Sequence, residues 1–183
     1  MAHGFKKTRK GIVGRFEAPE VQLLQKLFSD VAETLQPEAR PDEDPLAAMV
    51  GIDQDVSEPT DPALKRLLPA ASSDPEQAEE FRRLTDRSLR EAKIGALKAS
   101  SLALESDPVT LTVEQAQDFA RSLNDIRLVL ASRLDITTSE DAERIGEQVD
   151  FGEVEDIQDY MAVVYNFVSW LQESLMNALL KTL

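Results

Sequence analysis

The sequence predicts a mainly α-helical protein, a bundle of about five main helices with a short N-terminal β-hairpin. Apolar residues recur every three or four positions along most of the chain, and prolines followed by acidic residues mark several helix starts. The alternation of apolar and polar residues that is typical of strands is confined to the N-terminus. With 183 residues, 42% of them hydrophobic, the chain can bury a core of normal size, so we expect one helical domain over residues 1–183.

Residues 1–17 predict a basic hairpin. Two short segments, Phe5 to Arg9 and Ile12 to Phe16, flank a turn that contains Gly11. Two strands alone are marginally stable, so the hairpin should lie on helices or pair with a second copy. The five cations that precede the first acidic residue favour protection of a strand edge over a nucleic-acid-binding arm. They are Lys6, Lys7, Arg9, Lys10 and Arg15.

The first helix should begin at Ala18-Pro19-Glu20 and end before Pro37. Residues 37–62 are rich in proline and acids and predict a surface loop, with one short helical turn at Leu46 to Val50. A second short helix is expected at Ala63 to Leu68.

A long helix should run from Asp74 to about Leu104, because an N-cap, a proline and an acid open it. Its inward face is predicted to be rich in alanine, which lets a neighbouring helix approach closely. The predicted inward residues are Ala78, Phe81, Leu84, Ala92, Ala96, Ala99 and Ala103.

The segment Leu111 to Leu134 is predicted to be the central helix. One apolar stripe runs along it, whereas Leu128 and Val129 fall on other sides, so neighbours should cover the C-terminal half on more than one side. The stripe residues are Phe119, Leu123, Ile126, Leu130 and Leu134. Thr112 and Gln115 form a capping box at its start.

Two further helices complete the prediction, a short one at Ser139 to Glu147 and a last one at Glu155 to Leu180. Tyr160, Phe167 and Trp170 widen the apolar face of the last helix beyond what one neighbour covers. We therefore expect a homodimer that uses either the hairpin or these aromatic residues.

Composition excludes several kinds of chemistry. The chain has no cysteine, and its sole histidine, His3, lies in the N-terminal tail, so thiol, disulfide and histidine-dependent sites are excluded. Glycine is scarce and no Gly-rich loop follows a strand, so we expect no nucleotide and no other cofactor. No signal peptide or membrane-length apolar run is present, which predicts a cytoplasmic protein without membrane contact.

The net charge of −14 becomes about −19 once the N-terminal cations are set aside, so tight binding to duplex nucleic acid is not expected. The acidic clusters at Asp42 to Asp61 and Glu140 to Asp159 lack the spacing of a calcium loop and are read as solvated segments rather than metal sites. They could also attract a basic partner surface.

A basic patch on the long helix is the candidate partner-binding site. It consists of Arg83, Arg87, Arg90 and Lys98. The patch could contact phosphate or an acidic protein, but direct DNA contact would require all four side chains to be exposed and unpaired. Pairing with Asp86, Glu91 or the acidic loops is the favoured interpretation.

Asn124, Asp125 and Arg127 interrupt the central helix where it should become buried, and they form a candidate buried polar clamp. Arg127 would need a carboxylate partner or a bound anion if it were covered. A structural clamp is favoured over a ligand contact.

Several segments together resemble one known family. They are DPLAAMVGI (44–52), DPALKRLLP (61–69), EFRRLTDRSLREAK (80–93), LNDIRLVLASRL (123–134) and YNFVSWLQESLMNALL (165–180). The family comprises small actinomycete proteins that contain a domain of unknown function, and it includes AosR-type oxidative-stress-responsive transcriptional regulators. The resemblance implies a cytoplasmic regulator that acts through protein contacts, with an RNA polymerase sigma factor as the expected kind of partner.

The redox-sensing members of that family depend on a pair of cysteines, which this chain lacks, so disulfide sensing is not expected. We therefore expect a non-enzymatic regulatory interaction protein. The alternative is a small-ligand- or metal-dependent enzyme that uses carboxylates and Arg127. A concave site with convergent polar groups and shifted pKa values would favour the enzyme, and an exposed patch would favour the interaction protein.

Overall fold

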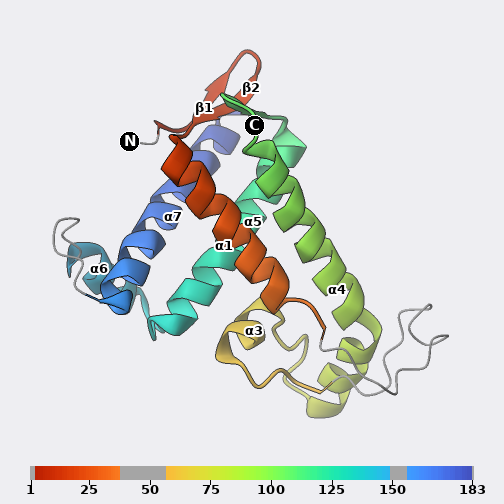
Figure 1. The fold of residues 1–183 in the computed structure, drawn as a ribbon. Coiled ribbons are helices and arrows are strands. Elements are labelled where there is room, and N and C mark those ends of the chain that lie inside the picture. Colours follow the sequence, from red (N-terminus) through yellow and green to blue (C-terminus); the bar gives the residue numbers. More distant parts are fainter. Residues whose placement is uncertain (1–2, 38–56, 149–155, 183) are drawn as a thin grey trace.

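A computed structural model describes residues 3–37, 57–148 and 156–182, and within them the chain is mainly helical with a small antiparallel sheet (Figure 1). This confirms the predicted fold class. The helices are α1 (Ala18–Thr34), α3 (Pro62–Leu67), α4 (Pro75–Ala103), α5 (Val113–Arg133), α6 (Ser139–Gln148) and α7 (Ile157–Leu180). The strands are β1 (His3–Thr8), β2 (Gly11–Arg15) and β3 (Val109–Leu111).

Helix α5 lies at the centre of the fold, where it contacts α1, α3, α4 and α7 (Figure 1). Leu123, Ile126 and Leu130 are buried, as the sequence predicts. Leu128 and Val129 are only half-buried, so neighbours cover the other sides of the helix incompletely. The start of α5 has the predicted capping box, in which Thr112 Oγ1 accepts from Gln115 N and Gln115 Oε1 accepts from Thr112 N.

The sheet contains a third strand that the sequence analysis missed. Its order is β1-β2-β3, and all pairs are antiparallel. Strand β3 is only three residues long, too short for a period-two pattern to stand out between two helices. Gly11 is required at the turn because its φ is +128° and a Cβ there would lie 2.6 Å from the Leu111 carbonyl oxygen.

The hairpin is held by α7 and the core rather than standing alone. The backbone N–H of Phe5 donates to Ser174 Oγ on α7 at 3.0 Å. The Phe5 ring lies edge-on to Phe119 of α5, which in turn lies edge-on to Phe28 of α1. Because β3 pairs with β2 and the helices α5 and α7 hold Phe5, the hairpin needs no second copy for its stability.

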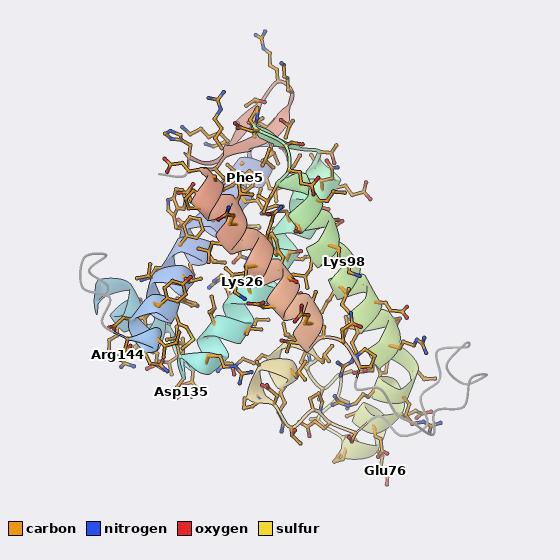
Figure 2. All side chains as sticks on the ribbon, in the orientation of Figure 1. Phe5, Lys26, Glu76, Lys98, Asp135 and Arg144 are labelled. Carbon is orange, nitrogen blue, oxygen red and sulfur yellow. The ribbon has the colours of Figure 1, made fainter. Side chains whose placement is uncertain are left out.

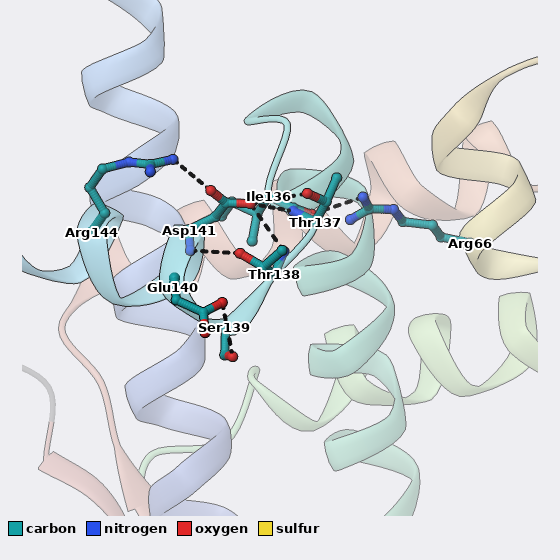
Figure 3. Close-up of polar contacts among 8 residues, drawn as sticks. All are labelled: Arg66, Ile136, Thr137, Thr138, Ser139, Glu140, Asp141 and Arg144. Carbon is teal, nitrogen blue, oxygen red and sulfur yellow. Dashed lines mark hydrogen bonds and ion pairs between the residues drawn. The ribbon is translucent and has the colours of Figure 1, made fainter.

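The corner between α5 and α6 is built almost entirely from local hydrogen bonds (Figure 3). Asp135 adopts a φ of 54°, and the Ile136 N–H donates to the Ala131 carbonyl at 2.9 Å, which closes α5 with a Schellman-type turn. Arg66 donates to the Ile136 carbonyl at 2.8 Å and ties the corner to α3. The corner therefore fixes the direction in which α6 leaves the bundle.

Asp141 caps this corner. Its Oδ2 accepts from the backbone N–H groups of Thr137 and Thr138, at 3.1 and 3.0 Å, and its Oδ1 accepts from Arg144 at 2.7 Å. These backbone donors, and after them Arg144, hold the pKa of Asp141 well below its ordinary value of 3.8.

We expect Asp141→Ala to lower the urea midpoint at pH 7, because the α5–α6 corner loses its charged acceptor. A depressed folded-state pKa stabilises the fold above the unfolded value of 3.8 and loses that contribution as pH falls below it. The difference in urea midpoint between the variant and the parent protein should therefore become smaller as the pH falls from 5 to 2, as followed by circular dichroism. A difference that is constant over this range would contradict the assignment.

The predicted inward face of α4 is wrong, and this correction matters most for function. Phe81 and Leu84 are 55% and 59% exposed, and Ala92 and Ala99 are exposed as well. The face that packs on α1 and α5 carries Ile94, Leu97, Ser100 and Leu104. Large aliphatic side chains bury more apolar area than alanine does, so the core takes that face and the alanine face turns outward.

Several sequence-based expectations lie outside the described residues. They concern the part of the 37–62 loop at residues 38–56, which includes the helical turn at Leu46 to Val50, and the acidic residues at 149–155. In the described part of the chain, no helix is long and apolar enough to cross a membrane.

Candidate functional site: an apolar groove beside helix α4

An open groove of about 800 Å³ runs between the C-terminal half of α4, the first half of α5 and the C-terminal end of α7. Its α4 wall contains Leu89 and Lys93 and four small residues, Ala92, Gly95, Ala96 and Ala99. The small residues leave the helix backbone close to the surface, so a bulky group from another molecule can approach it.

The opposite wall combines polar residues, among them Gln117, Asp118, Arg121 and Gln172, with larger apolar side chains that the described chain leaves exposed. Val113 at the start of α5 is 45% exposed, and Met176 and Leu180 near the end of α7 are 43% and 62% exposed. Single exposed apolar residues are common, whereas apolar side chains gathered in one groove are typical of a binding surface.

The apolar surface continues from the groove along the outside of α4. We call it the α4 face, and it consists of Ala78, Phe81, Leu84, Ala92, Ala96, Ala99 and Ala103, the same residues that the sequence analysis placed inward. All of them are partly or fully exposed. A 29-residue helix thus presents one apolar face to the core and a second one to solvent.

The floor of the groove holds one buried ion pair. Lys93 Nζ of α4 lies 2.7 Å from Asp125 Oδ1 of α5, and the Asp125 side chain is only 6% exposed. Burial raises the pKa of Asp125, and Lys93 opposes that rise by its hydrogen bond and its charge. Beside it, the Ser100 and Ser122 hydroxyls meet at 3.0 Å, so the pair and the two serines bring α4 and α5 together.

The predicted polar clamp is split between different neighbours. Asp125 pairs with α4, Asn124 lines the groove, and Arg127 turns to α7, where it donates to Ser169 Oγ at 3.1 Å and Gln172 Oε1 at 2.6 Å. The sequence analysis required a carboxylate or an anion beside Arg127 only if its side chain were covered, and Arg127 is partly exposed. Neutral oxygens suffice because the guanidinium is only partly buried and lies over the Tyr165 ring, 5.8 Å from its centroid.

The basic patch is likewise divided. Arg90 donates to Asp86 at 2.6 Å and to the Leu35 carbonyl at the end of α1 at 3.0 Å, so it holds α1 and α4 together. Arg87 pairs with Glu91 at 3.1 Å. Arg83 and Lys98 are exposed and make no ion pair with the described residues. Two of the four side chains therefore fail the condition that direct DNA contact requires.

A second exposed apolar surface lies on α7. Tyr160 and Trp170 are 47% and 43% exposed, while Phe167 is half-buried and stacks against Trp170 with ring centroids 6.2 Å apart. Among the described residues, no group of three or more potential ligands is placed to hold a metal ion. Every buried side-chain polar atom of the described residues has a hydrogen-bond partner.

Sequence reasoning missed Lys93, Ser100, Ser122 and the far wall of the groove. A signal was present, because Ile94, Leu97 and Leu104 form a second apolar stripe on the long helix. Two apolar stripes on one helix indicate two apolar faces, and among the described residues the face with Ile94 and Leu97 packs on α1 and α5 while the other stays largely exposed.

Among the described residues, the fold is a mainly helical one with a solvent-open groove beside α4. Residues 2–179 match the family described as Domain of unknown function (DUF2017), and the chain belongs to this family. No curated protein and no solved structure matches the chain.

Proposed function

We propose that this chain is a non-enzymatic regulatory protein of the cytoplasm that works by binding other proteins through the α4 face and its groove. One observation carries the proposal: among the described residues, a long helix leaves a row of apolar side chains exposed, and an open groove lies beside its C-terminal half. A surface of this kind favours burial against another protein.

The resemblance to AosR-type regulators supports a transcriptional role, with an RNA polymerase sigma factor as the partner class. Helices often bind in apolar grooves of this kind, using side chains spaced three and four residues apart. Regulation by a cysteine pair is outside this proposal, because the chain has no cysteine.

The enzyme alternative finds less support in the groove. Arg127, which it requires, is engaged with Ser169 and Gln172 on α7, and the buried carboxylate of Asp125 is neutralised by Lys93. A catalytic acid or base needs a free face toward its substrate, and the Lys93 contact occupies one oxygen of this carboxylate.

The test is capture of purified sigma factors from the source organism by the immobilised chain. We expect one of them to bind, and we expect Ala92→Glu and Ala99→Glu to weaken capture at least roughly tenfold, because each places a charge on an apolar contact surface. Both alanines are exposed, so the folded chain should tolerate glutamate there.

Gln22→Glu is the matched control, since it adds the same charge at an exposed position of α1. Its capture should equal that of the parent chain. Absence of binding to every sigma factor would reject the partner class. Sigma-factor binding that is equally strong with Ala92→Glu and Ala99→Glu would reject the α4 face as the contact surface.

A further inference from the structure

We propose that the α4 face also binds a second copy of this chain, with the two α4 helices packed antiparallel about a two-fold axis between Ser88 and Leu89. The inference rests on the proposed function, because it names a second occupant for the same surface. A two-fold contact requires the surface to be complementary to itself, and α4 meets this requirement in both size and charge.

The size pattern places the largest side chain of the face, Phe81, opposite a small residue. In an antiparallel pair, residues equally far from the centre lie opposite each other. About this centre, Phe81 falls opposite Ala96 of the second copy, Thr85 opposite Ala92, and Ala78 opposite Ala99. The exposed Phe81 ring of each chain therefore enters the groove of the other, where the wall contains small residues.

Gly95 makes room for this ring. A Cβ at Gly95 would meet nothing within 4 Å, so the single chain does not require glycine there. Glycine inside a helix is less stable than alanine. Its place beside Ala96 lets the Phe81 ring of the second copy approach the α4 backbone closely.

The charged residues of α4 are also arranged symmetrically about this two-fold axis. At about 100° per residue, Glu80, Arg87, Glu91 and Lys98 lie along one flank of the α4 face. If the centre lies at Leu89, within one residue of the centre given above, Glu80 falls opposite Lys98 of the second copy and Arg87 falls opposite its Glu91. Glu80 and Lys98 make no ion pair among the described residues, and Figure 2 shows Lys98 on α4. Arg87 and Glu91 already pair within one chain and would join their copies in a four-charge network.

The centre of the proposed pair lies near the middle of α4, so the two helices can overlap along nearly their whole length. The 29 residues of α4 span roughly 43 Å at about 1.5 Å per residue. Repulsion between two chains that each carry −14 is weakened at physiological salt, where exposed charges are screened beyond about 8 Å.

The experiment is sedimentation equilibrium of the full chain at physiological salt, from micromolar to millimolar concentration. We expect a monomer–dimer equilibrium. Glu80→Lys and Lys98→Glu should each raise the dissociation constant roughly tenfold, because each places like charges together twice across the axis. The double variant Glu80→Lys/Lys98→Glu should return to within about threefold of the parent chain, since both pairs are restored with reversed sign.

Phe81→Asp should abolish the dimer over this range, and Lys26→Glu on α1 is the matched control that should leave it unchanged (Figure 2). Far-ultraviolet circular dichroism checks that each variant remains folded, as expected for exposed positions. A monomer at every concentration would overturn the proposal, and so would a dimer that the double variant fails to restore. A monomer that still binds a sigma factor through α4 would leave the proposed function standing, whereas a dimer that binds none would reject the partner class alone.

Discussion

Phe119→Ala should lower the free energy of unfolding by roughly 3 to 5 kcal/mol, the range typical of a buried phenylalanine. Phe119 is 1% exposed, and its ring contacts Phe5 of β1 at 5.4 Å and Phe28 of α1 at 5.5 Å between centroids. One substitution thus removes both edge-on contacts and leaves a cavity where the sheet, α1 and α5 meet.

Urea unfolding followed by circular dichroism at pH 7 measures this loss. Ile157→Ala serves as the control, because Ile157 is 65% exposed and its truncation should cost no more than about 0.5 kcal/mol. A cost below about 1 kcal/mol for Phe119→Ala would mean that α5 is not the element on which the sheet and α1 pack.

Lys93→Met should cost roughly 2 kcal/mol or more at pH 7, because it leaves the buried Asp125 carboxylate without its cationic partner. The loss depends on pH in a defined direction. Burial raises the pKa of Asp125 above its ordinary 3.8, so the folded state holds the proton more firmly and this group's contribution to stability falls as pH rises through the folded-state pKa.

Removing Lys93 takes away the contact that opposes this rise, so the folded-state pKa of Asp125 should climb further. The stability deficit of Lys93→Met should then be largest at pH 7 and shrink toward pH 4. Lys93→Met/Asp125→Leu should recover most of the lost stability, since it removes both charges together.

Lys26→Met is the control for the loss of a lysine, because Lys26 and Asp30 form an exposed pair on α1 and its removal should leave the urea midpoint nearly unchanged. A Lys93→Met deficit that does not vary with pH would contradict the role assigned to Asp125.

Periodicity and capping residues were sufficient to predict the main helices of the fold. The capping box at Thr112 and the proline-led starts of α1, α3 and α4 each place a helix within a residue or two. Strand β3 was missed because a three-residue strand forms only through long-range pairing with β2.

The candidate site was harder to predict because it depends on which face of α4 the core selects. Both the alanine face and the face with Ile94 and Leu97 have helical spacing, so periodicity alone could not rank them. The partners of Arg127 were unpredictable for a similar reason, because Ser169 and Gln172 come from a helix far along the chain.

The outward orientation of the α4 face and its burial by another protein are the central claim. Alanine methyl groups report on it directly, without any substitution. We expect a soluble paramagnetic chelate to broaden the methyl signals of Ala92 and Ala99 in a dilute sample, as it broadens exposed Ala18, while the fully buried Ala116 stays sharp.

The decisive measurement repeats this experiment at high protein concentration and again after addition of a captured sigma factor. We expect the Ala92 and Ala99 signals to become protected in at least one of these samples while Ala18 remains broadened. Ala92 and Ala99 signals that stay as broadened as Ala18 in both samples would contradict the claim that the α4 face is the contact surface of this protein.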